Sequence, residues 1–143
     1  MSVKTGRRPR IGKYGKVAIE TTKRIRKHGS DPRKVWHKTY KKLFPEANDG
    51  HGCPLVAYLG LCEEGEINGV SRGSYILSAR KLNKMYALEA VRLLRLCPYF
   101  ESNKMKLWKK VLERSRPGEA VTHDYQVDVV LALWSEGFIS ISP

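Results

Sequence analysis

Residues 54–62 constrain the fold of this chain more than any other stretch. The run PLVAYLGLC is apolar on nearly every side when it is wound into a helix. A helix without a polar face has to be surrounded by other elements, so we expect this one at the centre of the fold. Pro54 favours the start of the helix, and Gly65 favours its end.

Five further segments repeat apolar residues with the period of an amphipathic helix. We expect helices at about residues 13–27, 32–44, 79–96, 103–115 and 123–136. The N-caps expected for the last four of them are Asp31, Ser78, Ser102 and Thr122. Their apolar stripes predict inward-facing side chains that include Met85, Leu96, Met105 and Tyr125.

The pattern predicts an all-α fold, with a single compact domain of about six helices over residues 13–143. Residues 1–12, MSVKTGRRPRIG, contain glycine and proline among the arginines and predict a flexible basic arm. Residues 66–77, EINGVSRGSYIL, hold short apolar pairs around two glycines. This segment fits either an irregular turn or a short β-ribbon.

The cysteines and the hydropathy indicate the compartment. Cys53, Cys62 and Cys97 are odd in number and lack CxxC spacing, which favours structural thiols over disulfides or a zinc site. No apolar run approaches the roughly 18 residues that a membrane span needs, and no apolar segment follows the basic N-terminus as in a secretory signal. We therefore expect a cytoplasmic protein without a membrane span, a metal or a cofactor.

Charge is distributed very unevenly along the chain. Residues 1–45 contain 15 Lys and Arg against two acidic residues, whereas residues 46–143 contain 12 of each sign. The whole net charge of +13 therefore lies in the first third. Such a field attracts polyanions, with nucleic acid as the first expectation, although a merely solubilising surface has the same composition.

The candidate nucleic-acid ligands are the basic residues of the arm, of the first two helices and of one turn. The arm supplies Arg7, Arg8 and Arg10, the first helix supplies Lys16, Lys23, Arg24 and Lys27, and the second supplies Arg33, Lys34, Lys38, Lys41 and Lys42. Arg72 is added because a helix ending in EEG before an Arg-Gly-Ser-Tyr tip is similar to the wing of winged-helix DNA-binding domains. A capping glycine with an ordinary turn explains that stretch equally well.

Two other classes of function compete with nucleic-acid binding. A protein-interaction module, either an inhibitor or an adaptor, would use the same charge toward a protein partner. A small enzyme would need a pocket formed by His51, Cys53, Glu63 and His123, with Cys53 and a histidine as a thiol–imidazole pair. No catalytic or phosphate-loop motif supports an enzyme.

The acidic residues offer little support for a metal site. Glu63, Glu64 and Glu66 are interpreted as exposed charge at a helix end rather than as a metal or catalytic site. Asp124 and Asp128, with the glutamates, are the only Mg²⁺ ligands that a metal-dependent nuclease would find in this chain.

Several short stretches resemble a family of small uncharacterised bacterial proteins of unknown function. They are GCP at 52–54, YLGLCEEG at 58–65, GSY at 73–75, NKMYALEAV at 83–91 and VVLALWSEGFI at 129–139. The resemblance implies one compact bacterial domain and supplies no activity.

Overall fold

The fold is known from a computed structural model, which describes residues 11–47, 52–77, 82–115 and 124–142. Within these ranges the helices are α1 (Lys13–His28), α2 (Pro32–Leu43), α3 (Gly52–Glu63), α4 (Leu82–Leu96), the 3-10 helix η1 (Pro98–Ser102), α5 (Lys104–Ser115) and α6 (Tyr125–Ser135). The described residues contain no β-strand, only one isolated antiparallel bridge between Ile67 and Ile139. The prediction of an all-α domain with six helices is confirmed.

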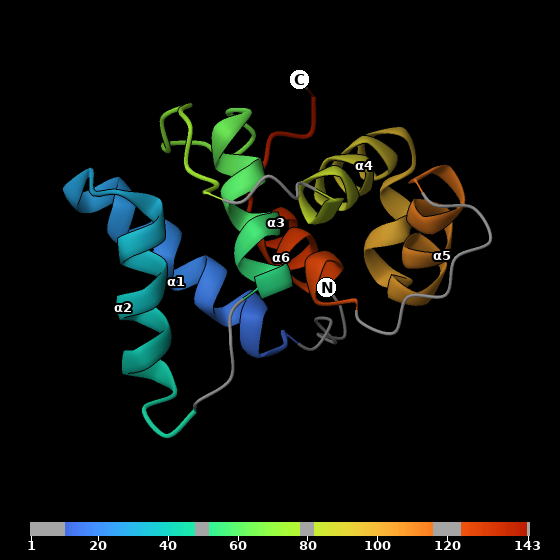
Figure 1. Cartoon of the computed structure of the whole chain (residues 1–143). Coiled ribbons are helices and arrows are strands. Elements are labelled where there is room, and N and C mark those ends of the chain that lie inside the picture. Colours follow the sequence, from blue (N-terminus) through green and yellow to red (C-terminus); the bar gives the residue numbers. More distant parts are fainter. Residues whose placement is uncertain (1–10, 48–51, 78–81, 116–123, 143) are drawn as a thin grey trace, which may run out of the picture.

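Helices α3 and α6 form the centre of the domain. α3 packs against α2, α4 and α6, and α6 also packs against α1 and α4, as Figure 1 shows. Leu55, Ala57, Tyr58, Leu59 and Leu61 of α3 are all buried, on every side of the helix. The prediction that this apolar helix is central is therefore confirmed, and its physical reason is the absence of a polar face.

Helices α1 and α2 form a hairpin that belongs to the same core. Gly29 ends α1 in the left-handed conformation, at φ 66°, and the Asp31 carboxylate caps α2 by accepting the Lys34 N–H at 3.1 Å. The ring of Trp36 lies 5.2 Å from that of Tyr58 in α3, measured between centroids. The described part of the basic third, from residue 11 onward, is thus built into the domain rather than appended to it.

Some residues of the stripes predicted for α4 and α5 are exposed. Met85 and Leu96 are 58% and 69% exposed, whereas α4 buries Tyr86, Ala87 and Ala90. Met105 is 73% exposed, since the buried stripe of α5 consists of Leu107, Trp108 and Val111. Tyr125, expected inside, is partly exposed and contacts the ring of Tyr14 on α1.

One predicted cap is wrong, and two lie outside the described residues. Ser102 belongs to η1 and donates its hydroxyl proton to the carbonyl of Tyr99, so it does not cap α5. Asn103 has that role instead, because its Oδ1 accepts the Lys106 N–H at 3.2 Å. Ser78 and Thr122, predicted to cap α4 and α6, fall in ranges that the structure does not describe.

Residues 66–77 follow the first of the two predicted alternatives, an irregular turn. Ile67 bridges Ile139, and the Asn68 N–H donates to the carbonyl of Phe138 at 2.8 Å. The extended tail after α6 therefore pairs with the start of this segment. Because its described residues form no strand pair of their own, the wing interpretation is wrong.

Candidate nucleic-acid interface

Helix α2 lies at the outer edge of the molecule (Figure 1). It carries a continuous stripe of basic side chains. Lys34, Lys38, Lys41 and Lys42 are all exposed, and their spacing of three and four residues keeps them on one side of the helix. His37 lies within the same stripe. With Lys38, Lys41 and Lys42 it lines a shallow, open hollow of about 450 Å³.

Helix α1 carries a shorter stripe of the same kind. Lys16 and Lys27 are exposed, and Arg24 is half-buried beside them. Lys23 also faces solvent, but its ammonium lies 3.4 Å from the carboxylate of Glu20. An exposed pair of this kind contributes little to stability.

Seven predicted ligands form neither an ion pair nor a side-chain hydrogen bond with another described residue. We call them the basic face: Lys16, Arg24, Lys27, Lys34, Lys38, Lys41 and Lys42. Of the acidic residues on the same hairpin, Glu20 is engaged with Lys23 and Asp31 is engaged in capping α2. Because no carboxylate neutralises these side chains, their field extends into solvent, where it attracts anions.

His37 was not predicted as part of this surface. Burial and the neighbouring guanidinium of Arg33 both lower the pKa of its imidazole from the ordinary value of 6.5. The ring is therefore mainly neutral at pH 7 and contributes shape and hydrogen bonding rather than charge. Its position three residues after Lys34 and four before Lys41 is the sequence signal that identifies it.

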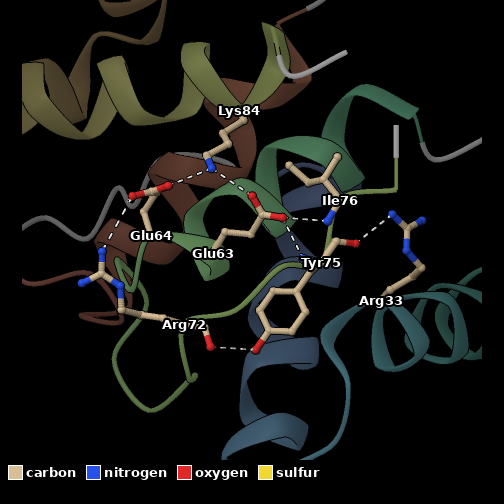
Figure 2. A network of polar contacts seen from close by, with 7 residues as sticks. All are labelled: Arg33, Glu63, Glu64, Arg72, Tyr75, Ile76 and Lys84. Atoms are coloured by element: carbon tan, nitrogen blue, oxygen red, sulfur yellow. Dashed lines mark hydrogen bonds and ion pairs between the residues drawn. The ribbon is translucent and has the colours of Figure 1, made fainter. Parts of the chain in front are cut away.

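Two predicted ligands are engaged with other segments of the chain. The Arg33 guanidinium donates to the carbonyl of Tyr75 at 3.1 Å and so joins α2 to the segment after α3 (Figure 2). The Arg72 guanidinium lies 3.8 Å from the carboxylate of Glu64, across a helix end. Arg7, Arg8 and Arg10 lie outside the described residues.

Glu63 is the centre of a buried polar network and not the exposed charge that the sequence predicted. It is 8% exposed. Figure 2 shows its Oε2 accepting the N–H groups of Tyr75 and Ile76, both at 2.7 Å, while its Oε1 accepts from the Lys84 ammonium at 2.9 Å. The same ammonium lies 2.8 Å from Glu64. These contacts fix segment 66–77 and the start of α4 on the end of α3.

The network also determines the protonation of its carboxylate. Burial opposes ionisation of Glu63, but the hydrogen bonds from Ile76, Lys84 and Tyr75 outweigh it, so the pKa of Glu63 lies below its ordinary value. Lys84 is correspondingly held charged: burial acts against its charge, and the two glutamates raise its pKa overall. The hydrogen bonds that Glu63 accepts therefore all hold segments of the fold together.

Two of the four residues of the hypothetical enzyme pocket are described, and they lie apart. Cys53 and Glu63 lie at opposite ends of α3, about 15 Å apart along the helix axis. His51 and His123 fall outside the described residues. Within the part of the chain that is described, no group of three or more His, Cys, Asp or Glu side chains is arranged to hold a metal ion.

The acidic residues of α6 are engaged with a lysine. The Lys104 ammonium lies 2.6 Å from Asp128 and 3.3 Å from Asp124, which joins the start of α5 to the start of α6. Nearby, the side-chain amide of Gln126 donates to Oδ1 of Asn83 and links α6 to α4. These contacts occupy the carboxylates that a magnesium ion would need.

No described helix combines the length and the hydrophobicity that crossing a bilayer requires.

Comparisons with known proteins show the family but supply no activity. Neither the curated proteins nor the solved structures include a match to this chain. Residues 11–140 match the family described as "Family of unknown function (DUF6979)". Because that match covers nearly the whole sequence, the chain belongs to this family of unknown function.

Proposed function

We propose that this protein binds nucleic acid and that its basic face contacts the phosphate groups. One observation carries the proposal: seven Lys and Arg side chains on one helical hairpin form neither an ion pair nor a side-chain hydrogen bond with another described residue. Four of them form an unbroken stripe along α2. Phosphate contacts by such side chains release counterions, which is the main source of sequence-independent affinity for nucleic acid.

Salt dependence is the signature of this binding mode. Each phosphate that a lysine neutralises adds about 0.9 to the slope of log affinity against log salt for duplex DNA. Between 1 M and 0.1 M salt, one such contact therefore raises the affinity about eightfold. Loss of three contacts should lower the affinity at least about tenfold, even when only some of the three are fully formed.

The test is fluorescence anisotropy with labelled DNA and RNA over a salt series, using the full chain. The informative variant is K38Q/K41Q/K42Q. Deletion of residues 1–45 would be uninformative, because it removes the buried Trp36 and Tyr40. Surface substitutions leave the core intact.

A matched control is available on α5. K106Q/K109Q/K110Q removes the same charge from exposed lysines, and Figure 1 shows α5 on the opposite side of the molecule from α2. We expect at least tenfold weaker binding and a flatter salt dependence for the α2 variant only. Equal weakening by both variants would mean that binding depends on the net charge alone, and it would overturn the proposed site. No binding by the folded protein at low salt would overturn the function and direct the search to an acidic protein partner.

A further inference from the structure

Nearly all described arginines are engaged with other residues, so that the basic face consists mainly of lysines. Arg26 donates to the carbonyl of Asn68 at 2.7 Å, and Arg33 donates to that of Tyr75. Arg72, Arg92, Arg95 and Arg114 each face a glutamate. Among the described residues, Arg24 is therefore the one arginine with neither an ion pair nor a hydrogen bond, and the other six members of the basic face are lysines.

This division limits what the basic face recognises. Arginine has the planar fork that reads guanine edges and grips phosphate with two bonds, whereas lysine acts as a compact point charge. A surface of lysines responds to the density of negative charge and carries little information about the bases. We expect its ligands to differ in affinity according to charge density.

The aromatic residues of the hairpin exclude the usual mode of binding to single strands. Residues 1–47 contain four aromatic side chains of the Phe, Trp and Tyr type. Tyr14, Trp36 and Tyr40 are buried, and Phe44 packs its ring 5.7 Å from that of Tyr40. Proteins that bind single strands without sequence preference stack successive bases on exposed aromatic rings. No described Phe, Trp or Tyr ring of the hairpin lies exposed on the basic face, and the imidazole of His37 offers a single ring rather than a series.

The dimensions of the stripe favour a duplex. Lys34 to Lys42 covers about 12 Å of helix axis, at about 1.5 Å per residue. Over that length a DNA duplex presents about seven phosphate charges, and one of its strands alone presents about half as many. Because point charges respond to charge density, the same lysines gain more from the duplex.

We propose that the partner of the basic face is a nucleic-acid duplex, bound along its phosphate backbone without regard to base sequence and in preference to single strands. The inference rests on the proposed function, since it specifies the ligand of that same face. Its chemistry is common to DNA and RNA duplexes.

The test compares probes of equal length at equal salt. They are a labelled DNA duplex, each of its separated strands, a second DNA duplex of different base composition, and an RNA duplex. We expect the duplexes to bind at least about fivefold more tightly than the strands, with a steeper salt dependence, and the two DNA duplexes to agree within about threefold. Comparison of the DNA duplex with the RNA duplex identifies which of the two the protein binds more tightly.

A lysine-to-arginine variant tests the point-charge argument. K38R/K41R/K42R retains every charge, so we expect its affinity for the duplex to stay within about threefold of the original. Single strands that bind as tightly as the duplex, or a tenfold difference between the two DNA sequences, would overturn the inference while leaving the proposed function intact. Absence of binding to every probe would instead remove the proposed function, and this inference with it.

Discussion

The two charged regions of the molecule use their charges in opposite ways. At the end of α3, Glu63, Glu64 and Lys84 are paired at 2.8–2.9 Å, and two of the three side chains are nearly buried. On α2, four exposed lysines have no acidic partner among the described residues. Paired, buried charges stabilise and orient the fold, whereas unpaired exposed charges contribute little to it. The basic face is therefore free to bind a ligand at small cost to stability.

The largest effect is expected from breaking the buried pair. Glu63→Ala removes the acceptor of two backbone N–H groups and leaves the Lys84 ammonium with Glu64 alone. We expect the free energy of unfolding to fall by about 3 kcal/mol, because desolvated donors lose their partner. Urea denaturation followed by circular dichroism measures it. Glu113→Ala is the matched control, since that glutamate forms an exposed pair with Lys110 on α5. An equal loss of unfolding free energy in the two variants would contradict the difference between buried and exposed pairs.

A smaller effect on the free energy of unfolding is expected from a change in pH. The pKa of Glu63 is lowered from its ordinary value of 4.5 in the folded state, so its ionised form contributes stability at neutral pH. That contribution is complete above about pH 5 and is lost as the pH falls through the lowered pKa. Unfolding of the original chain and of Glu63→Gln, compared from pH 7 down to pH 3, should show a difference that narrows with acidity. A difference that stays constant over this range would show that the charge of Glu63 does not stabilise the fold.

The smallest effect on stability is expected on the basic face. K38Q/K41Q/K42Q breaks no contact between described residues and relieves repulsion between neighbouring lysines. We expect the free energy of unfolding to stay within about 0.5 kcal/mol of the original, or to rise slightly. Thermal and urea unfolding check this expectation. A loss above 1 kcal/mol would mean that these lysines support the fold.

Local signals in the sequence were sufficient for much of the fold. An all-round apolar helix has to be central, and an Asp-Pro pair begins α2 as expected from capping chemistry. The stripes of α4 and α5 were less certain, because Met85 and Met105 are apolar residues that remain on the surface. An apolar side chain at helical spacing indicates that burial is feasible, whereas the neighbouring helix determines which side is buried.

The polar network could not be predicted from the sequence. Glu63 finds its partners at Lys84, Tyr75 and Ile76, between 12 and 21 residues away. No spacing rule connects such positions, so a buried glutamate and an exposed one look alike in a row of acidic residues. The exposed lysines of α2 were predicted because helical period alone separates them from Trp36 and Tyr40. That these lysines bind nucleic acid stays a prediction.

The contact between α1 and α6 has a consequence for the order of folding during synthesis. Gly15 approaches Ala132 so closely that an added Cβ would lie 2.9 Å from the Ala132 methyl group. At about 5 to 20 residues per second, a ribosome needs roughly 6 to 23 s to reach Ala132 after Gly15. During that interval α1 lacks the helix that covers one of its sides. The hairpin with the basic face is thus synthesised early, and a nascent chain interrupted before α6 would leave the side of α1 around Gly15 uncovered.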